Sequence, residues 1–361
     1  MSSRSTVLVT GGAGFIGSEL VRQLAARGAH VLIVDNLVNG TRANVEEVLS
    51  DRVTLLVADI RALDRIEREL ASVRVVYHLA CLGVRHSVHA PLENHDVNAT
   101  ATLRLLAACR HAGVPRFVYV SSSEVYGTAK WVPMTEDHPA FPCTVYGASK
   151  LAGECFTRAY YRTYGYPTVV VRPFNTYGPR SHHEGDSGEV IPKFMLRCLA
   201  GLPMVVFGDG TQTRDFTYVS DTASGILLAG EHDEAVGDTI NLGSGSEVTI
   251  NDLGRQIAVV TGRPSSALQH DRPRPGDVLR LYADMSHART TLGFAPGVSL
   301  TEGLEKLLAW YQSQNVSPQE LLEREIVHNW EGEGRPAASA EAAAAKEGRP
   351  LPTDAPVDTA R

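Results

Sequence analysis

The chain has 361 residues, of which 43% are hydrophobic and 21% charged, and its formal net charge is −7. This composition is typical of a soluble globular protein, and the acidic balance provides no basic surface for nucleic acid or for an acidic membrane. No apolar run reaches the roughly 18 residues of a membrane span, and no charged segment followed by an apolar run opens the sequence. We therefore expect a cytoplasmic protein whose partners are small molecules or other copies of the chain.

The first half of the chain alternates short β-branched runs with helical patterns. The runs at residues 5–11, 30–36, 53–59, 73–80, 116–122 and 167–175 are separated by helical patterns at 15–28, 97–113 and 146–165. Strands that alternate with helices predict right-handed βαβ units, and hence an α/β fold with a doubly wound parallel sheet.

Three segments follow from this pattern. Residues 1–175 form the predicted sheet domain. Beyond them the alternation loosens, which predicts a smaller α/β domain at 176–330 that is interleaved with the last strands. Residues 331–361 are rich in Ala, Gly, Pro and charge and have no aromatic residue, so we predict a disordered tail.

A glycine-rich turn follows the first predicted strand. Gly11, Gly14 and Gly17 are spaced by two residues each and open a helix, where free N–H groups and the helix dipole favour a pyrophosphate. Asp35 ends the second strand, where a carboxylate accepts a hydrogen bond from a ribose hydroxyl and repels a 2′-phosphate. The pattern therefore predicts NAD rather than NADP, with Asp59 and Ile60 of the third strand beside the adenine.

A second motif combines Tyr146 and Lys150, which lie four residues apart at the start of a predicted helix and share one face. An ammonium group and the positive charge of an oxidised nicotinamide stabilise a phenolate, and so lower the pKa of the tyrosine toward neutrality. The tyrosine then serves as a base. The stretch SSSEVYG precedes this motif and places Glu124 at the end of a buried strand.

These motifs together resemble the extended short-chain dehydrogenases/reductases, specifically the NAD-dependent nucleotide-sugar epimerases, dehydratases and decarboxylases. The resemblance spans nearly all of residues 5–315 and rests on TGGAGFIG, VDN, YHLA, VNATATL, SSSEVYG, YGASK, RPFNTYGPR, FGDGTQTRDFTYVSD and RPRPGDV. It implies a Rossmann domain with a smaller C-terminal substrate domain, NAD as cofactor, a nucleotide-diphosphate sugar as substrate and a homodimer.

The resemblance also assigns residues. It implies that Tyr146 is the base, that Lys150 holds the nicotinamide ribose, and that Ser122 hydrogen-bonds the sugar O4. The cofactor residues that it implies, together with those of the glycine-rich turn, are Gly11, Gly14, Phe15, Ile16, Gly17, Asp35, Asn36, Asp59, Ile60, Leu79, Ala80, Asn98, Tyr146 and Lys150. The substrate residues are Arg85, Asn175, Arg180, Val190, Arg214, Arg274 and Asp277.

Glu124 and its neighbours bear on the reaction. In the dehydratases that the chain resembles, a glutamate at this position takes the C5 proton, whereas a simple 4-epimerase needs no further base. Ser123 stands where dTDP-glucose dehydratases carry an aspartic acid, and Cys143 stands where decarboxylases carry an arginine. Arg85 resembles a position of uronate 4-epimerases, where it meets a carboxylate or diphosphate; the alternative is a pair with Glu93 or Asp96.

The sequence therefore predicts an enzyme that oxidises a nucleotide-linked hexose at C4 and uses Glu124 as the base at C5 in a dehydration. A 4-epimerase, possibly acting on a uronic acid, is the first alternative, and a UDP-glucuronate decarboxylase the second. A non-catalytic redox sensor is a different class, but it has no need of the tyrosine and lysine. The spacing of the histidines and of the five scattered cysteines fits no metal site.

Overall fold

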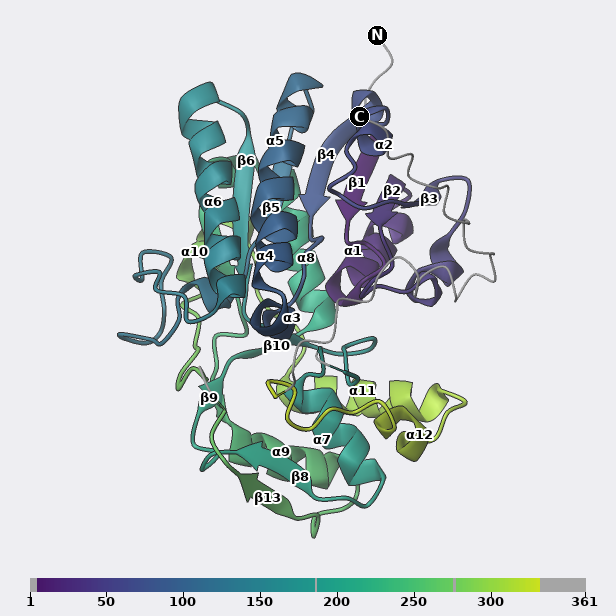
Figure 1. Ribbon diagram of the computed structural model, residues 1–361, viewed down its shortest axis with the longest axis vertical. Helices are drawn as coiled ribbons and strands as arrows, with labels where there is room; N and C mark the ends of the chain where they lie inside the picture. The colour runs from purple at the N-terminus through teal and green to yellow at the C-terminus, as the bar shows by residue number, and fades with distance from the viewer. Residues whose placement is uncertain (1–4, 186, 275–276, 332–361) are drawn as a thin grey trace, which may run out of the picture.

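A seven-stranded parallel sheet forms the larger part of the computed structural model, which describes residues 5–185, 187–274 and 277–331 (Figure 1). The strand order is β11-β6-β5-β4-β1-β2-β3, with every neighbouring pair parallel. The strands are β1 (Thr6–Thr10), β2 (His30–Asp35), β3 (Val53–Val57), β4 (Val73–His78), β5 (Phe117–Val120), β6 (Thr168–Pro173) and β11 (Thr239–Leu242). The predicted doubly wound sheet is thereby confirmed.

Helices cover both faces of this sheet. One face packs against α1 (Phe15–Ala26), α8 (Val219–Glu231) and α10 (Ser286–Leu292), and the other against α2 (Asp64–Glu67), α5 (Ala101–His111) and α6 (Val145–Tyr164). The central strands carry apolar residues at consecutive positions because both of their faces are buried. The short helices α3 (Val84–His89) and α4 (Pro91–His95) lie beyond the end of β4, and a π-helical turn (Asp96–Thr100) leads into α5.

A smaller unit lies below the carboxyl ends of the strands in Figure 1. It contains the parallel pair β8 (Met204–Phe207) and β13 (Leu268–Asp271), the antiparallel pair β9 (Thr213–Arg214) and β12 (Val248–Thr249), and the helices α7 (Val190–Leu199), α9 (Ile250–Val260), α11 (Leu300–Ser313) and α12 (Pro318–Leu322). The parallel pair β7 (Asn175–Tyr177) and β10 (Phe216–Tyr218) lies between the two units. The smaller unit has an apolar core of its own, which includes Phe194, Leu253 and Leu307.

The chain crosses between the two units more than once. After β10 it returns to the sheet through α8 and β11, and then leaves again for α9 and β13. This crossing is the interleaving that the sequence predicts for the last strands. The predicted domain bounds stay a prediction, and the predicted disordered tail, apart from Glu331, lies outside the described residues.

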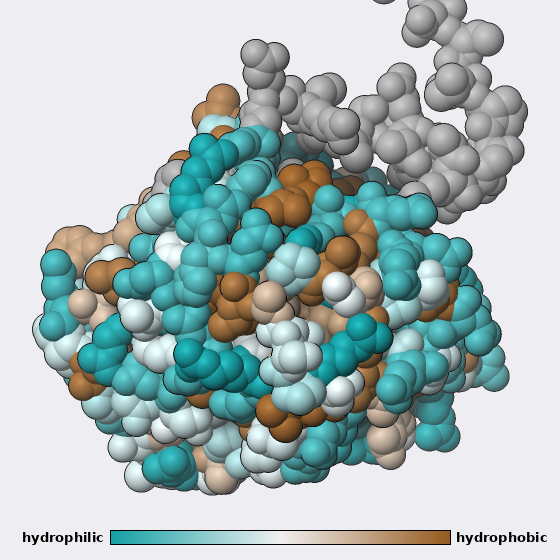
Figure 2. Space-filling view, turned by 90° about the horizontal axis from the view of Figure 1, so that it is seen from below, coloured by the Kyte–Doolittle hydropathy of each residue, from teal (hydrophilic) through white to brown (hydrophobic). Residues whose placement is uncertain are grey.

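The face in Figure 2 shows apolar residues in small groups among hydrophilic ones. Among the described residues, no helix combines the length and apolar character needed to cross a membrane.

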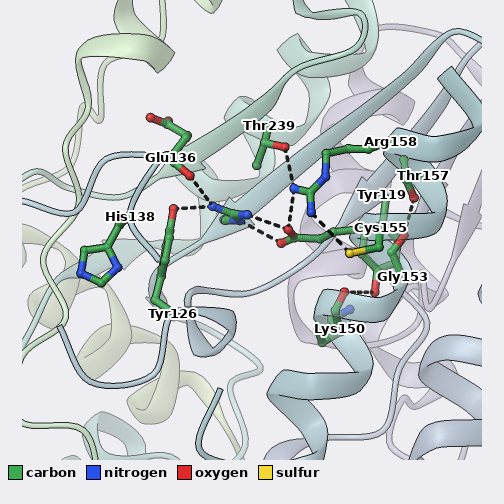
Figure 3. A network of polar contacts seen from close by, with 12 residues as sticks. Tyr119, Tyr126, Glu136, His138, Lys150, Gly153, Cys155, Thr157, Arg158 and Thr239 are labelled. Atoms are coloured by element: carbon green, nitrogen blue, oxygen red, sulfur yellow. Dashed lines mark hydrogen bonds and ion pairs between the residues drawn. The ribbon is translucent and has the colours of Figure 1, made fainter. Parts of the chain in front are cut away.

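A buried ion pair fixes α6 against the sheet. Arg172 of β6 donates two hydrogen bonds to Glu154 of α6, from Nε to Oε1 at 2.8 Å and from Nη2 to Oε2 at 2.7 Å. The same guanidinium donates from Nη1 to the Tyr126 hydroxyl at 2.8 Å and to the carbonyl oxygen of Glu136 at 3.0 Å. Figure 3 shows this network between the loop that follows β5 and helix α6. The network joins three segments that are far apart in sequence.

We predict that Glu154→Gln destabilises the fold by about 3–5 kcal/mol, because it leaves the buried guanidinium of Arg172 without its charged partner. Urea unfolding measures the loss. Glu46→Gln is the matched control, because Glu46 pairs with Arg42 on an exposed surface and its loss should cost at most about 1 kcal/mol. An equal, small effect of both substitutions would show that the buried pair does not hold α6.

Candidate active site

One large cavity lies between the carboxyl ends of the strands and the smaller unit. Its volume is about 1220 Å³, enough for a dinucleotide and a second nucleotide-sized ligand together. Parallel sheets commonly bind ligands at the carboxyl ends of their strands, at the point where the strand order changes direction. In this sheet that point lies between β1 and β4. Among the residues that the sequence singles out, those that line it are Gly11, Gly14, Phe15, Ile16, Gly17, Asp35, Asn36, Asp59, Ile60, Leu79, Ala80, Arg85, Ser122, Ser123, Glu124, Tyr146, Lys150, Asn175, Val190, Arg214, Arg274 and Asp277.

The glycine-rich turn forms one end of the cavity. Gly11 has φ of 69°, and a Cβ there would lie 2.7 Å from the backbone nitrogen of Ala80, so the turn requires glycine. Gly14 precedes α1 without a side-chain cap, which leaves N–H groups of the first turn for a ligand. These residues fit a pyrophosphate.

Asp35 follows in the same end of the cavity. Its Oδ2 accepts from the Ala13 N–H at 3.0 Å and its Oδ1 from the Leu37 N–H at 2.8 Å. Both bonds hold the carboxylate at the cavity wall and leave acceptor capacity on each oxygen. Burial raises the pKa of Asp35, against these two hydrogen bonds. The geometry suits a ribose with a free 2′-hydroxyl.

Asn98 lies outside the lining. Its side chain accepts from the Leu82 N–H at 2.8 Å and donates to the Leu82 carbonyl oxygen at 2.9 Å. Its amide also lies 3.3 Å from the Ser149 hydroxyl, next to Lys150. Asn98 therefore holds the loop after β4 against α6 and does not itself line the cavity.

Tyr146 and Lys150 project from α6 toward the ends of β5 and β4. Lys150 is buried and donates from Nζ to the Val120 carbonyl oxygen at 2.7 Å, and burial lowers its pKa. Burial also raises the pKa of Tyr146 well above its ordinary value, Cys81 adds to the rise, and a hydrogen bond with Ser122 opposes it. The predicted fall of the Tyr146 pKa also depends on the positive charge of an oxidised nicotinamide, so it stays a prediction.

Glu124 lies in a short 3₁₀ turn (Ser123–Val125) that follows β5. Its backbone N–H donates to the Ser122 hydroxyl at 3.2 Å, so the serine caps the turn that carries the carboxylate. Burial raises the pKa of Glu124, while the charges of Arg214 and Arg85 lower it. The carboxyl group is thus a half-buried acid or base on the same wall as Ser122.

Three arginines surround the opposite side of this region. Arg214 donates to Asp277 Oδ1 at 2.6 Å and to the Val278 carbonyl oxygen, also at 2.6 Å. Burial lowers the pKa of Arg274 to about 10 and also lowers the pKa of Arg85. Glu124 and Asp277 are the acids that act on Arg85.

The alternative pairing of Arg85 is not what the structure shows. Glu93 lies 3.4 Å from Arg61 and 3.3 Å from His86, and Asp96 lies 3.8 Å from Arg61. Arg85 instead faces the cavity, where a ligand anion can approach it.

Arg180 is not brought into the cavity. It has φ of 71°, and its Nη2 lies 3.1 Å from Glu47 Oε1. Arg180 is therefore absent from the cavity lining, and the substrate role that the resemblance implies for it stays a prediction.

Several buried polar atoms of the lining have no hydrogen-bond partner within the part of the chain that the structure describes. They are His86 Nδ1, Ser121 Oγ, Asn175 Oδ1 and Arg274 Nε. Unpaired buried polar groups are rare in folded proteins and are usually completed by water or ligand. Their concentration here indicates a polar ligand. Across the described residues, no group of three or more His, Cys, Asp or Glu is arranged to hold a metal.

Sequence reasoning missed a group of ionisable residues around α7. Glu189 and Lys193 both line the cavity. Burial raises the pKa of Glu189 to about 7 and lowers that of Lys193 to about 8. The only sequence signal was their position beside Val190, because nothing local shows that α7 turns toward the sheet.

Known proteins resemble this chain over most of its length. Residues 8–307 match the family model described as GDP-mannose 4,6 dehydratase. UDP-glucose 4-epimerase of Mycolicibacterium smegmatis is 37% identical over 313 residues, covering 85% of this chain and 99% of the relative. UDP-glucuronic acid decarboxylase 1 of Arabidopsis thaliana is 33% identical over 324 residues, covering 88% and 72%. The solved dTDP-glucose 4,6-dehydratase of Streptomyces venezuelae, with NAD bound, is 34% identical with a TM-score of 0.81, covering 86% and 97%.

The raised pKa of Glu189, at the start of α7, can be tested through the pH dependence of stability. The pKa of Glu189 is about 7 in the folded protein, against an ordinary value of 4.5. Its protonated form is therefore favoured by folding. Between these two values the unfolded chain is ionised and the folded one is not, so stability falls as pH rises through this window.

We predict that Glu189→Gln removes this loss, and that the free energy of unfolding falls less from pH 5 to pH 8 in the variant than in the wild type, by about 1–3 kcal/mol. Urea unfolding at the two pH values measures the difference. Glu46→Gln, on the exposed surface, should leave the wild-type pH dependence in place. Parallel curves for wild type and Glu189→Gln would contradict the raised pKa.

With the glycine turn, Asp35, Tyr146, Lys150 and the arginine wall in one cavity, and with a family match over most of its length, this chain belongs to the extended short-chain dehydrogenases/reductases, among the nucleotide-sugar epimerases and dehydratases.

Proposed function

We propose that the protein is an NAD-dependent nucleotide-sugar dehydratase that oxidises a hexose at C4 and eliminates water across C5 and C6. The single observation that carries this reaction is Glu124, a half-buried carboxyl of raised pKa on the same cavity wall as Ser122 and Tyr146. A general base works best when its pKa approaches the working pH, and a 4-epimerase that only turns a ketone over has no use for such a group.

In this proposal, different residues along the cavity bind the cofactor and the substrate. Gly11, Gly14 and Asp35 bind the dinucleotide, and the preference for NAD over NADP rests on the carboxylate of Asp35. Bound NAD supplies the acceptor and later the donor of a hydride. Lys150 lies one turn of helix from Tyr146 and positions the nicotinamide ribose. Arg214 and Arg274 bind the diphosphate of the substrate, where fork-shaped guanidinium groups are well suited.

Side chains of the protein carry out the proton transfers. Tyr146 takes the proton of the C4 hydroxyl, and Ser122 stabilises the phenolate by the hydrogen bond that already opposes the rise in its pKa. Glu124 then takes the C5 proton, which the 4-keto group makes acidic. The hydroxyl at C6 leaves as water after protonation, and when the hydride returns to C6 a proton adds to C5, so that the two protons taken from the C4 hydroxyl and from C5 are both accounted for. Ser123 is a poor acid, so protonated Glu124 or a water molecule supplies the proton that the leaving hydroxyl takes.

A 4-epimerase acting on a uronic acid is the second candidate. Arg85 favours it, because this arginine faces the cavity beside Glu124 in addition to the two arginines that suit a diphosphate. A substrate carboxylate at C6 would meet that third positive charge. A decarboxylase ranks lower because Cys143 stands where the decarboxylases that the chain resembles carry an arginine for the substrate carboxylate.

Product mass separates the candidates. Incubation with UDP-GlcNAc, UDP-glucose, UDP-glucuronate or dTDP-glucose should yield, with one of them, a product lighter by one water. Unchanged mass with inverted C4 would support the epimerase, and loss of carbon dioxide the decarboxylase. The homodimer implied by the resemblance stays a prediction that light scattering after gel filtration tests.

Glu124→Gln should retain NAD binding, since the dinucleotide end of the cavity is unchanged, while exchange of the C5 hydrogen with solvent collapses. NMR in deuterated water follows that exchange. Wild-type exchange in the variant would remove Glu124 from the mechanism.

Tyr146→Phe should lower turnover by about 10² or more, because no other group takes the C4 proton. Cofactor affinity, measured by calorimetry, is the control and should change little. A turnover near that of the wild type would mean that Tyr146 is not the base.

A further inference from the structure

The segment that follows α12 passes over the cavity. From Glu325 the chain, drawn in yellow in Figure 1, turns back over α7. Glu325, Val327 and Asn329 line the cavity, although they lie about 200 residues after the catalytic turn in sequence. We call residues 325–330 the strap.

Polar contacts tie the strap to the smaller unit. Glu325 Oε2 accepts from Arg197 Nη1 at 2.7 Å, and the carbonyl oxygen of Ile326 accepts from Lys193 Nζ at 2.7 Å. Further along, His328 Nε2 lies 2.8 Å from Asp271 Oδ2 at the end of β13. Each of these contacts uses a different part of the strap, so its path is fixed on α7 and on β13.

Aromatic contacts join the strap to Arg274. The rings of Trp330 and Phe207 meet edge to face, with centroids 4.6 Å apart and an interplanar angle of 87°. The guanidinium carbon of Arg274 lies 5.2 Å from the Phe207 centroid and 5.8 Å from that of Trp330, within the range of cation–π contacts. Trp330 therefore forms part of the support on which Arg274 rests.

The strap also reaches the other wall. His89, at the end of α3, lies with Nε2 3.4 Å from the carbonyl oxygen of Asn329. Since α3 follows the sheet strand β4 while Phe207 ends β8, the strap connects the two units on opposite sides of one cavity.

The charges near the strap indicate which half of a substrate it faces. Burial lowers the pKa of Lys193, the charges of Arg274, Arg85 and Arg197 lower it further, and Glu325 is the acid on the strap that opposes them there. Arg85 and Arg274 also have the acids Glu124 and Asp277 near them. A group of buried cations at one end of a cavity favours a ligand with negative charge. The diphosphate of a nucleotide sugar has that charge, whereas its hexose does not.

We infer that the strap is a substrate-binding element that holds Arg274 against the nucleoside diphosphate half of the substrate, and so sets affinity without touching the reacting sugar carbons. This inference rests on the proposed nucleotide-sugar function and adds residues 325–330 to its site. It makes Trp330 a positioning residue that acts through Arg274.

The test is a comparison of Trp330→Ala with the wild-type protein. Loss of the aromatic support should raise KM for the nucleotide sugar, and Kd for UDP or dTDP measured by calorimetry, by about ten-fold. The value of kcat should fall by less than about two-fold, because Tyr146 and Glu124 keep their places. Trp131→Ala is the matched control; Trp131 is exposed, packs on His138 and lies outside the lining, so KM, Kd and kcat should stay at wild-type values.

Two further measurements keep the outcome decisive. His328→Ala leaves Trp330 in place but frees the strap from β13, and should weaken UDP or dTDP binding by about three-fold; circular dichroism shows whether each variant is folded. Wild-type affinity in a folded Trp330→Ala or His328→Ala protein would overturn the substrate-binding role of the strap. A fall in kcat with KM unchanged would overturn it as well. Failure of the wild-type protein to bind UDP, dTDP or GDP would instead overturn the proposed function on which the strap rests.

Discussion

The position of helix α6 is the constraint on which the site depends. The helix carries Tyr146 and Lys150 at one end and Glu154 eight residues after Tyr146, and Glu154 binds Arg172 by two hydrogen bonds within the protein. The Tyr119 hydroxyl adds a bond to the Lys150 carbonyl oxygen at 3.2 Å. Because the same guanidinium also holds Tyr126 and Glu136, the loop after β5 and the helix share one anchor (Figure 3). Glu124 belongs to that loop, so its distance from Tyr146 is set by the same anchor.

Charge then divides the cavity into two ends. The dinucleotide end has backbone N–H groups of α1 and the carboxylate of Asp35, which together suit a pyrophosphate and a ribose. The other end gathers arginines, with Asp277 and Glu124 as the acids that act on them. In the proposed function the reacting carbon of the substrate lies between these ends, next to Tyr146 and Ser122. This division explains why one cavity of about 1220 Å³ holds both groups of residues.

Sequence reasoning succeeded where chemistry depends on local spacing. The glycines before α1, Asp35 at the end of β2, and the four-residue spacing of Tyr146 and Lys150 each imply a position that a strand or helix then fixes. It gave no guidance where the position of a residue depends on how distant elements pack. Arg180 matches a motif, yet its pairing with Glu47 takes it away from the cavity. Lys193, Glu189 and Trp330 had no local signal, because only the path of α7 and the return of the chain after α12 bring them to the site.

The central claim is that Glu124 turns a C4 oxidation into an elimination, and the fate of the C4 hydrogen tests it most directly. With a substrate that is deuterated at C4, a dehydratase passes the label to bound cofactor and returns it to the carbon that lost its hydroxyl. We predict that NMR of the product finds the deuterium at C6, with loss of one water. Deuterium retained at C4 of an inverted sugar would contradict the account and make the protein an epimerase.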